Sequence, residues 1–588
     1  MTILRFFIVY RSTEVKRKEM AATVSWNQTY FLFGHGLGLS VLLAALPIFT
    51  LLFLLGVIRK PAWIAGLAGL GVTLMLAIGA YHMPPVTAIS AAANGAAFGL
   101  FPISWIVFWA IALFRLTVET GHFEIIKDSI GKLTADPRLQ ALLIAFAFGA
   151  FLEGAAGFGT PVAIAATMLI GLGFSPFSAS AICLLANTAP VAFGSIGIPL
   201  VTLTGTTGLP LAKLSAAVGI ISTPTSFMIP AYLIVAIGGF GSLSGSLVPT
   251  LLAGSVFAVA QLVVATYLGT QLTDILAALA AIAVLVLYLR IRHPMNDQSE
   301  LTCGAESVAR RGIRFARMGA TGEISDALES EKKAVPDYGI GTVLYAWLPY
   351  ALLVLCVLLW GWLPVQSTLN KFTILLPWPF LHDVVHRMPP IVSAATPYHA
   401  LFNLNWFSAS GTACMAATLL SAICLRIKVR DFVRILLGVA RQLLLPTATV
   451  TSVLAIAFLM NYCGATATLG LAFAATGAMF PFFSALLGWV GVFLTGSDTS
   501  SNALFGSLQV VTANRLGFDP VFMAAANSSG GVMGKMISLQ TIAIAAAATG
   551  LSQPDESRLF RFTLKHSVLL AGVVGCVTLF CTYVFHFR

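Results

Sequence analysis

The feature that most constrains this chain is a series of long apolar runs that carry almost no charge. Between residues 139 and 289 the only charged side chains are Glu153, Lys213 and Asp274. Hydrophobic residues make up 58% of the 588-residue chain and charged residues 9%, whereas a soluble domain has about 25% charged residues. A helix needs about 20 apolar residues to cross a bilayer, so these runs predict a protein that crosses a membrane many times.

Apolar runs of suitable length recur along the whole chain, for example at 37–57, 98–114, 248–268, 344–362, 407–425 and 568–584. They predict an all-α polytopic fold with about 12 to 14 transmembrane or re-entrant segments. The absence of a two-residue alternation argues against a transmembrane barrel. The expected division of the chain is an N-terminal extension (1–36), a first transmembrane half (37–289), a cytoplasmic linker (290–343) and a second half (344–588) in which 364–406 is extracytoplasmic.

The net charge of +11 reflects membrane topology rather than nucleic-acid binding. The basic residues gather in short loops, at 59–60, 115–138 and 426–441, and the positive-inside rule places such loops in the cytoplasm. The chain is therefore expected in the inner (plasma) membrane. The eight cysteines show no close pairing, which predicts neither a disulfide framework nor a metal site. The basic stretch 1–19 precedes Met20, and we expect Met20 to be the true initiator.

Parity of membrane crossings indicates a re-entrant segment in the first half. Both flanks of 139–289 are basic, so an even number of crossings is expected between them. The stretch nevertheless contains five apolar runs: 139–172, 177–203, 214–238, 248–268 and 273–289. We expect 139–172 to enter and leave on one face, because glycines and Pro161 interrupt it and irregular backbone at membrane depth lines a cavity or is buried in protein.

The interruption in that run carries an acidic residue. Segment 151–161 reads Phe-Leu-Glu-Gly-Ala-Ala-Gly-Phe-Gly-Thr-Pro and places Glu153 among apolar residues, where a charge costs about 3 kcal/mol or more. The glycines let the backbone approach a ligand closely. A helix that restarts near Thr160 would point its positive N-terminal end at the cavity.

A second break follows at 187–199, and the second half repeats the scheme. Asp498 lies in the polar segment 494–506, and Asn527 begins another break-prone segment, 527–538. The spacing from acid to asparagine is 34 residues in the first half (Glu153 to Asn187) and 29 in the second (Asp498 to Asn527). Interrupted hydrophobic pairs in corresponding places predict a transporter built from two repeats.

Each of these residues also has a purely structural interpretation. Glu153 would be a protonated carboxyl hydrogen-bonded between helices, and Asp498 would cap the helix that follows it. Lys535 would extend to the membrane surface. Asn187 and Asn527 would join neighbouring helices.

Four segments resemble the signature segments of the L-lactate permease family. They are FLEGAAGFGTPVAIAA (151–166), NTAPVAFGSIGIP (187–199), GWVGVFLTGSDTSSNALFG (488–506) and NSSGGVMGKMIS (527–538). The similarity continues at 381–393 and 405–413, and it extends from about Trp26 to about Val584 without most of the central linker. The resemblance implies proton-coupled uptake of L-lactate, with D-lactate and glycolate as further substrates. It also implies similarity to ion-coupled carboxylate carriers with paired hairpins and elevator-like movement.

In this interpretation helix ends and backbone amides of both halves hold the substrate carboxylate. These are at Gly157, Gly159 and Thr160 in the first half and at Thr499, Ser500, Ser501 and Asn502 in the second. The residues expected to read the 2-hydroxyl and line the cavity are Asn187, Thr188, Asn527, Ser528 and Ser529. Glu153 is the candidate proton carrier because burial favours the neutral form of a carboxyl. Asp498 is the second choice, and Lys535 balances charge.

The expected ligands are a small 2-hydroxy monocarboxylate and H⁺, with membrane lipid around the protein, no cofactor, no metal and no nucleic acid. A homo-oligomer is compatible with this interpretation. The chain shows no catalytic pair or nucleophile pattern, so an enzyme is not expected. A sodium-coupled carrier of another small carboxylate and, more remotely, an anion channel remain the alternatives. One departure from the family pattern is Leu539, which stands where Pro is expected and argues against a proline-driven break next to Lys535.

Overall fold

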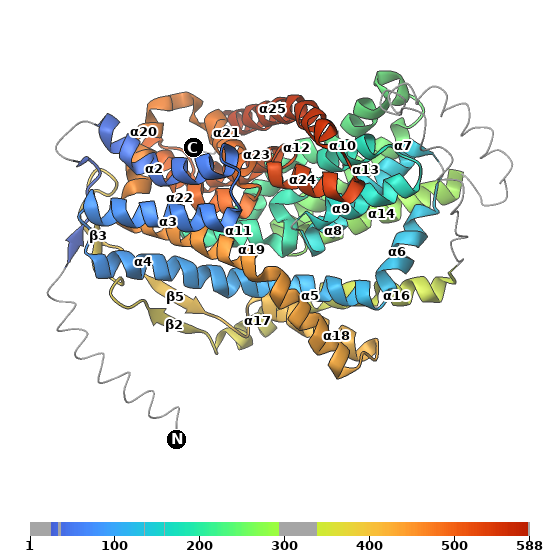
Figure 1. Cartoon of the computed structure of the whole chain (residues 1–588), viewed down its shortest axis with the longest axis horizontal. Coiled ribbons are helices and arrows are strands. Elements are labelled where there is room, and N and C mark those ends of the chain that lie inside the picture. Colours follow the sequence, from blue (N-terminus) through green and yellow to red (C-terminus); the bar gives the residue numbers. More distant parts are fainter. Residues whose placement is uncertain (1–24, 33–36, 135, 158, 293–337, 586–588) are drawn as a thin grey trace.

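The computed structural model describes residues 25–32, 37–134, 136–157, 159–292 and 338–585 (Figure 1). This part of the chain is mostly helical, as predicted. Twelve of its helical segments are long and apolar enough to cross a membrane, at the lower end of the predicted 12 to 14. The predictions for residues 1–19 and for most of the linker 290–343 lie outside the described residues.

The first half consists of helices and short 3-10 or π segments. They are α2 (Leu37–Gly56), α3 (Ala62–Gly79), α4 (Pro85–Phe98), η2 (Gly99–Ser104), α5 (Trp105–Glu119), α6 (His122–Gly131), α7 (Pro137–Gln140), η3 (Ala141–Phe148), α8 (Gly149–Ala155), α9 (Thr160–Gly171), α10 (Pro176–Ala186), η4 (Val191–Phe193), α11 (Gly194–Thr207), α12 (Leu211–Gly238), η5 (Phe240–Ser242), α13 (Leu247–Tyr267) and α14 (Thr273–Arg292).

The second half is also mainly helical, apart from the segment 364–406. Its helices are α16 (Ile340–Gly361), α17 (Leu363–Asn370), α18 (Ser410–Cys424), α19 (Val429–Cys463), α20 (Ala465–Phe473), η7 (Ala474–Met479), α21 (Phe480–Thr495), α22 (Asp498–Leu516), α23 (Pro520–Lys535), α24 (Leu539–Thr549) and α25 (Gln553–Val584).

Segment 364–406 contains short strands that the sequence did not predict. Strand β2 (Ile374–Pro377) pairs antiparallel with β5 (Leu401–Leu404). Strand β3 (Val385–Arg387) lies between β1 (Trp26–Asn27), to which it is parallel, and β4 (Thr396–Pro397), to which it is antiparallel. The pairing of β1 with β3 ties the start of the described chain to this segment.

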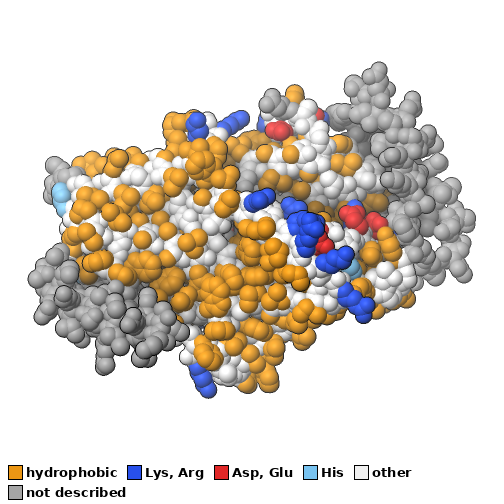
Figure 2. All heavy atoms as spheres, turned by 60° about the horizontal axis from the view of Figure 1, so that its bottom comes forward, with side chains coloured by type: hydrophobic (Ala, Val, Ile, Leu, Met, Phe, Trp, Pro, Cys, Tyr) orange, Lys and Arg blue, Asp and Glu red, His pale blue; other side chains and the backbone are white. Residues whose placement is uncertain are grey.

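The outer surface is apolar over wide areas, as a lipid-facing protein requires. Figure 2 shows one face of the molecule, on which hydrophobic side chains are spread over much of the described surface and Lys and Arg gather in a few places. Exposed large hydrophobic side chains occur on helices of both halves, for example Leu42, Phe49, Met75, Val259, Leu344 and Leu444. Contiguous apolar surface of this kind marks contact with a membrane or a partner.

Both predicted breaks of the first half are present. Helix α9 begins at Thr160 with a proline in its first turn, after Gly157 and Gly159 in the left-handed region (φ 59° and 81°). Helix α9 packs back on α8 and η3, so the run 139–172 forms a hairpin. Helices α10 and α11 are bent by 67° at the second break.

The second break is strained as well as bent. Ser195 and Ile196 have φ values of 50° and 60°, and Gly197 follows at 75°. Left-handed backbone at a β-branched residue such as Ile196 is rare and costs roughly 1–3 kcal/mol. Strain of this kind persists only where the surrounding packing enforces it, and it is typical of functional sites.

The helices of the second half are also interrupted, before α22 and after Lys535. Each interruption differs in one detail from the sequence-based prediction. Ser497, not Asp498, is the N-cap of α22, because its side chain accepts the N–H of Ser500. Asp498 is the first helical residue, so the capping interpretation of Asp498 is wrong. The backbone also breaks after Lys535 although no proline follows, since the Ser538 side chain caps α24 by accepting the N–H of Thr541.

Helices α21 and α23 approach so closely that only glycine fits between them. A Cβ placed on Gly488 would lie 1.8 Å from the carbonyl oxygen of Asn527, and one on Gly530 would lie 2.1 Å from that of Ala485. Small residues at helix interfaces allow such approach in membranes. This packing holds α23, with Asn527 and Lys535, against the rest of the second half.

We expect Gly488→Ala to force α21 and α23 apart and to destabilise the fold by about 3 kcal/mol, the upper end of the usual cost of overpacking. Gly438→Ala in α19 is the matched control, because nothing lies within 4 Å of the added methyl group and alanine favours a helix. The measurement is thermal unfolding of the purified protein in detergent. Equal midpoints for the two variants would contradict the close approach.

Candidate functional site

The site is defined by buried charge. Among the described residues, only four Asp, Glu, Lys or Arg side chains are buried: Glu153, Asp274, Asp498 and Lys535, which are 2%, 1%, 3% and 8% exposed. Lys535 interacts electrostatically with both Asp274 and Asp498, and Asp274 also interacts with Glu153. All four therefore belong to one cluster inside the membrane-spanning part. Helices α8, α11, α22 and α23, which surround it, lie near the middle of Figure 1.

Glu153 and Lys535 form an ion pair that joins the two halves of the chain. The ammonium Nζ of Lys535 at the end of α23 donates to Glu153 Oε1 in α8 at 2.6 Å, across a separation of 382 residues. The strained break makes room for the carboxylate: a Cβ on Gly194 would lie 2.7 Å from Glu153 Oε1. Since the ammonium turns inward to this partner, the interpretation of Lys535 as a surface-seeking side chain is wrong.

Asp498 lies at the start of α22 and is held by side chains of α22 and α23. Its Oδ2 accepts hydrogen bonds from Ser528 Oγ at 2.6 Å and from Asn502 Nδ2 at 3.2 Å. The position suits a carboxylate, because the N-terminus of a helix attracts negative charge. A Cβ on Gly531 would lie 2.4 Å from Asp498 Oδ1, so this glycine leaves space beside the second oxygen.

A chain of hydrogen-bonded amides continues from Asp498 between α22 and α23. Asn527 Nδ2 donates to Asn502 Oδ1 at 2.9 Å, and Gln509 Nε2 donates to Asn527 Oδ1 at 3.0 Å. Asn502 Nδ2 also lies 3.2 Å from the carbonyl oxygen of Pro199 in α11. The network thus connects the break of the first half with the break of the second.

Asp274 is a member of the cluster that lies outside the predicted site residues. It lies in the first turn of α14, and a Cβ on Gly154, the neighbour of Glu153, would lie 2.9 Å from its Cβ. Gln261 Nε2 is 3.4 Å from Asp274 Oδ1 and 3.1 Å from the carbonyl oxygen of Ala189. A single acid in an apolar stretch is the signal that identified Glu153, and the same signal applies to Asp274.

Each of the three buried carboxyl groups has one oxygen without a hydrogen-bond partner among the described residues. These oxygens are Glu153 Oε2, Asp274 Oδ2 and Asp498 Oδ1. Buried polar atoms are nearly always paired, so three such oxygens in one cluster are unusual. A proton or cation can bind to each of them without displacing an existing hydrogen bond.

Asn187, at the first-half break, is a further unpaired group. Both its amide nitrogen and its amide oxygen are buried without a partner among the described residues. It ends α10 at the first-half break, as Asn527 belongs to the corresponding segment of the second half. A donor and an acceptor left unpaired together suit a ligand hydroxyl, which can accept one hydrogen bond and donate another.

Several predicted residues contact backbone rather than the charged cluster. Thr160 donates to the carbonyl of Gly157, Thr188 to that of Leu185, and Ser501 to that of Gly488. Ser500 contributes its backbone N–H to the Ser497 cap, and Ser529 contacts Ser222 of α12 at 3.4 Å. Gly159 approaches Ile544 of α24, and Thr499 is half-buried beside Asp498. These residues shape the breaks around the cluster.

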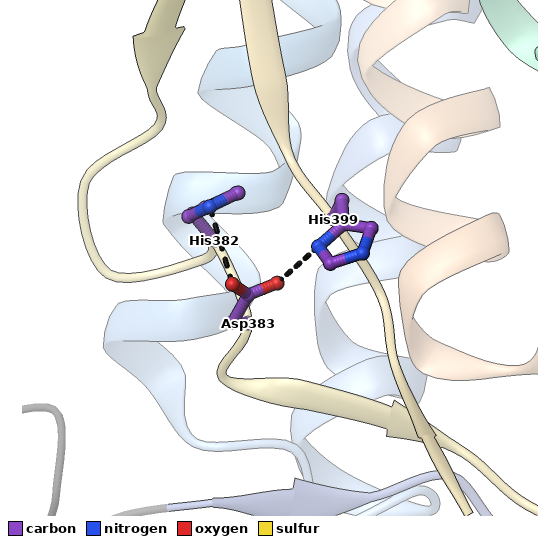
Figure 3. Close-up of side chains that lie close together, drawn as sticks. All are labelled: His382, Asp383 and His399. Carbon is purple, nitrogen blue, oxygen red and sulfur yellow. Dashed lines mark hydrogen bonds and ion pairs between the residues drawn. The ribbon is translucent and has the colours of Figure 1, made fainter.

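A second group of ionisable side chains lies in the β segment, away from the buried cluster (Figure 3). Nitrogen or oxygen atoms of His382, Asp383 and His399 lie within 4.8 Å of one another, close enough for a metal ion. However, His382 Nδ1 accepts the N–H of Ala400 at 3.1 Å, so the ring proton sits on Nε2, which faces Asp383 at 3.2 Å. A histidine nitrogen that binds a metal must have a free lone pair, and neither ring nitrogen of His382 has one in this arrangement. The hydrogen bonds therefore give the cluster a structural role, because they join the turn at 378–383 to residues 399–400.

Known proteins of one family match this chain along nearly its whole length. The L-lactate permease family profile matches residues 40–585. The glycolate permease GlcA of Escherichia coli K12 is 41% identical over 568 residues, which cover 96% of this chain and 99% of that protein. The L-lactate permease of Bacillus subtilis 168 is 42% identical over 580 residues (96% and 99%), and that of Escherichia coli K12 is 41% identical over 566 residues (95% and 98%).

Among solved structures, Neisseria gonorrhoeae MtrF, described as illuminating a class of antimetabolite efflux pumps, aligns with a TM-score of 0.47 at 13% identity over 91% of this chain and 97% of that chain. The permease relatives and the twelve candidate spans identify a multi-pass plasma-membrane transporter and not an enzyme. On the match of the family profile and the identity along nearly its whole length, the chain belongs to the L-lactate permease family.

Proposed function

We propose that this chain takes up L-lactate, together with D-lactate and glycolate, by symport with protons across the plasma membrane. The names of its relatives supply the substrate class, small 2-hydroxy monocarboxylates. The observation that carries the proton coupling is the buried ion pair between Glu153 and Lys535 inside a cluster that also contains two further acids.

Charge balance supports coupling to a cation. With all four groups ionised, three carboxylates and one ammonium leave two negative charges in a buried site. Each uncompensated buried ion costs several kcal/mol, and a substrate anion would add a third negative charge. Anion binding is therefore favourable only if the carboxyl groups first take up protons or another cation. The unpartnered carboxyl oxygens are where those protons would bind.

Glu153 and Lys535 link proton binding to substrate binding. Protonation of Glu153 removes the negative partner of the ammonium, so Lys535 Nζ becomes available to the substrate carboxylate, with which it forms a charge-assisted hydrogen bond. Loss of the proton restores the ion pair and displaces the substrate. The unpaired amide of Asn187 then forms hydrogen bonds with the 2-hydroxyl of the substrate.

Proteoliposome uptake of labelled L-lactate tests the proposal. With an inward proton gradient and no sodium, we expect L-lactate to accumulate above its external concentration and an uncoupler to abolish the accumulation. A saturable, uphill process also separates a carrier from a channel. Accumulation of a different carboxylate but not of lactate or glycolate would contradict the substrate assignment.

Sodium coupling is the second candidate, because backbone carbonyls at interrupted helices coordinate Na⁺ in other carriers. The three unpartnered carboxyl oxygens are open to Na⁺ as well as to protons. The same vesicles with an inward sodium gradient at equal pH distinguish the two. Accumulation under the sodium gradient alone would replace the proton by sodium and leave the roles of Glu153 and Lys535 in place.

A further inference from the structure

A cavity of about 310 Å³ lies at the far ends of two helices that begin at the buried cluster. Its walls come from β3, α11, α20, α22, the end of α19, the loop 390–392, and the residues that directly follow β1 and β4. Ligand pockets span roughly 300–1,000 Å³, so this one suits a small ligand.

Among the described residues that line the cavity, every charged side chain is positive. Arg387 and Arg515 are among its lining residues, and no Asp or Glu is. Neither arginine has a carboxylate within 4.0 Å among the described residues. Arg387 lies over the ring of Tyr398, 3.7 Å from its centroid, a contact that orients the guanidinium but does not neutralise it.

The phenol of Tyr30, which interacts with Arg387, adds no negative charge. Burial raises the pKa of the Tyr30 phenol, so this hydroxyl stays neutral and donates to Gln28 Oε1 at 2.9 Å. The remaining walls offer neutral polar groups from Asn461, Ser507 and Asn514. Two guanidinium groups that have no carboxylate partner among the described residues, with neutral donors around them, suit an anion, because the planar fork of arginine matches a carboxylate.

The cavity is close to the buried cluster along the helices. Ser507 in its wall follows Asn502 of the amide network by five residues in α22, a rise of about 7.5 Å at 1.5 Å per residue. Ser507 Oγ donates to the carbonyl oxygen of Thr206 at 2.6 Å, and Asn461 Nδ2 lies 3.3 Å from the same oxygen. Thr206 is near the end of α11, which begins at the strained break. Helices α11 and α22 therefore connect the cavity with the substrate site.

We propose that this cavity is a second carboxylate-binding site, in which Arg387 and Arg515 capture the hydroxy-acid anion before it moves to the cluster around Lys535. The substrate class rests on the proposed function, whereas the presence of an anion site rests on the cavity and its arginines. Positive charge at a concave entrance raises the local concentration of anions and their association rate. The phosphate of an acidic lipid headgroup would meet the same two groups.

Arginine modification tests binding without requiring transport. The purified protein is treated with phenylglyoxal, and the extent of reaction at Arg387 and Arg515 is measured by mass spectrometry. We expect L-lactate to slow the reaction at both residues and its uncharged analogue lactamide not to do so. Arg434 is the internal control, because it is exposed and paired with Asp431 on α19. No protection at lactate concentrations that saturate uptake would overturn the proposal.

Two further arms separate this site from its alternatives. In Lys535→Gln, protection by lactate is expected to persist, and its loss would mean that the arginines only report the buried site. Protection by micelles that contain an acidic lipid, with none from lactate, would assign the cavity to a headgroup and overturn a substrate role. If lactate protects the two arginines in a protein that shows no proton-driven uptake, the proposed coupling is wrong and the second binding site remains.

Kinetics supply the functional arm. The double variant Arg387→Gln/Arg515→Gln is expected to raise the KM for L-lactate about tenfold at low salt with little change in maximal rate, because the loss is one of electrostatic capture. High salt screens such capture, so the difference in KM between the double variant and the protein without substitutions should shrink. Arg434→Gln is the matched control. An unchanged KM, or an equal loss of maximal rate, would overturn the capture role.

Discussion

Lys535→Gln is expected to lower L-lactate uptake by about 100-fold, because it removes the only buried ammonium among the described residues and with it a charge-assisted hydrogen bond worth up to about 3 kcal/mol. It also leaves Glu153 buried without its partner, which costs about 3–5 kcal/mol when a buried pair is broken on one side. The single variant should therefore unfold at a lower temperature as well as transport poorly.

A second variant separates these two effects. Lys535→Gln/Glu153→Gln removes both charges, so we expect stability close to that of the unmodified protein while uptake stays low. Lys213→Gln, at an exposed position near the start of α12, controls for loss of a lysine and should change neither property. Normal lactate uptake in a folded Lys535→Gln protein would exclude Lys535 from the binding site and leave the ion pair a purely structural role.

Glu153→Gln is expected to abolish accumulation driven by a proton gradient while exchange of labelled for unlabelled L-lactate continues. Glutamine has nearly the same shape as glutamate and can still accept a hydrogen bond from Lys535 Nζ, but it cannot bind and release a proton. Lys535 then stays available to the substrate throughout the cycle, so the carrier equilibrates lactate without concentrating it.

Two assays on the same proteoliposomes measure this separation: accumulation under an imposed gradient, and counterflow with no gradient. Glu119→Gln, at an exposed position at the end of α5, is the matched control and should behave as the unmodified protein. Accumulation retained by Glu153→Gln would show that another group carries the coupled proton, and Asp274 and Asp498 would be the next to test. Loss of exchange together with accumulation, in a folded protein, would argue for a binding rather than a coupling role.

The helices and their interruptions were largely predictable from local sequence. A run of about 20 apolar residues can satisfy its backbone in a bilayer only as a helix, and the described part of the chain contains twelve such segments. Breaks appear at 156–159, where Gly157 and Gly159 adopt left-handed backbone and Pro161 opens the next helix, and around 187–197, where Gly197 adopts left-handed backbone. These preferences depend on a residue and its immediate neighbours, so no knowledge of the fold was needed to place them.

Local sequence was less reliable in the details of the second half. Ser497 and Asp498 are both good N-caps, and which of them begins the helix depends on the contacts of Asp498 with Ser528 and Asn502. The break after Lys535 does not need the proline that Leu539 replaces, because Ser538 supplies the cap.

The partners within the site depend on packing between distant parts of the chain. No pattern of residues pairs Lys535 with Glu153 across 382 positions, and none brings Asp274 next to Gly154. Those contacts arise where the hairpin of the first half meets α23, α11 and α14. A charged residue within an apolar stretch is costly to bury, so the sequence alone identifies four residues as unusual: Glu153, Asp274, Asp498 and Lys535. Which of them compensate one another follows from the three-dimensional arrangement of helices, since electrostatic pairing depends on distance in space and not on separation along the chain.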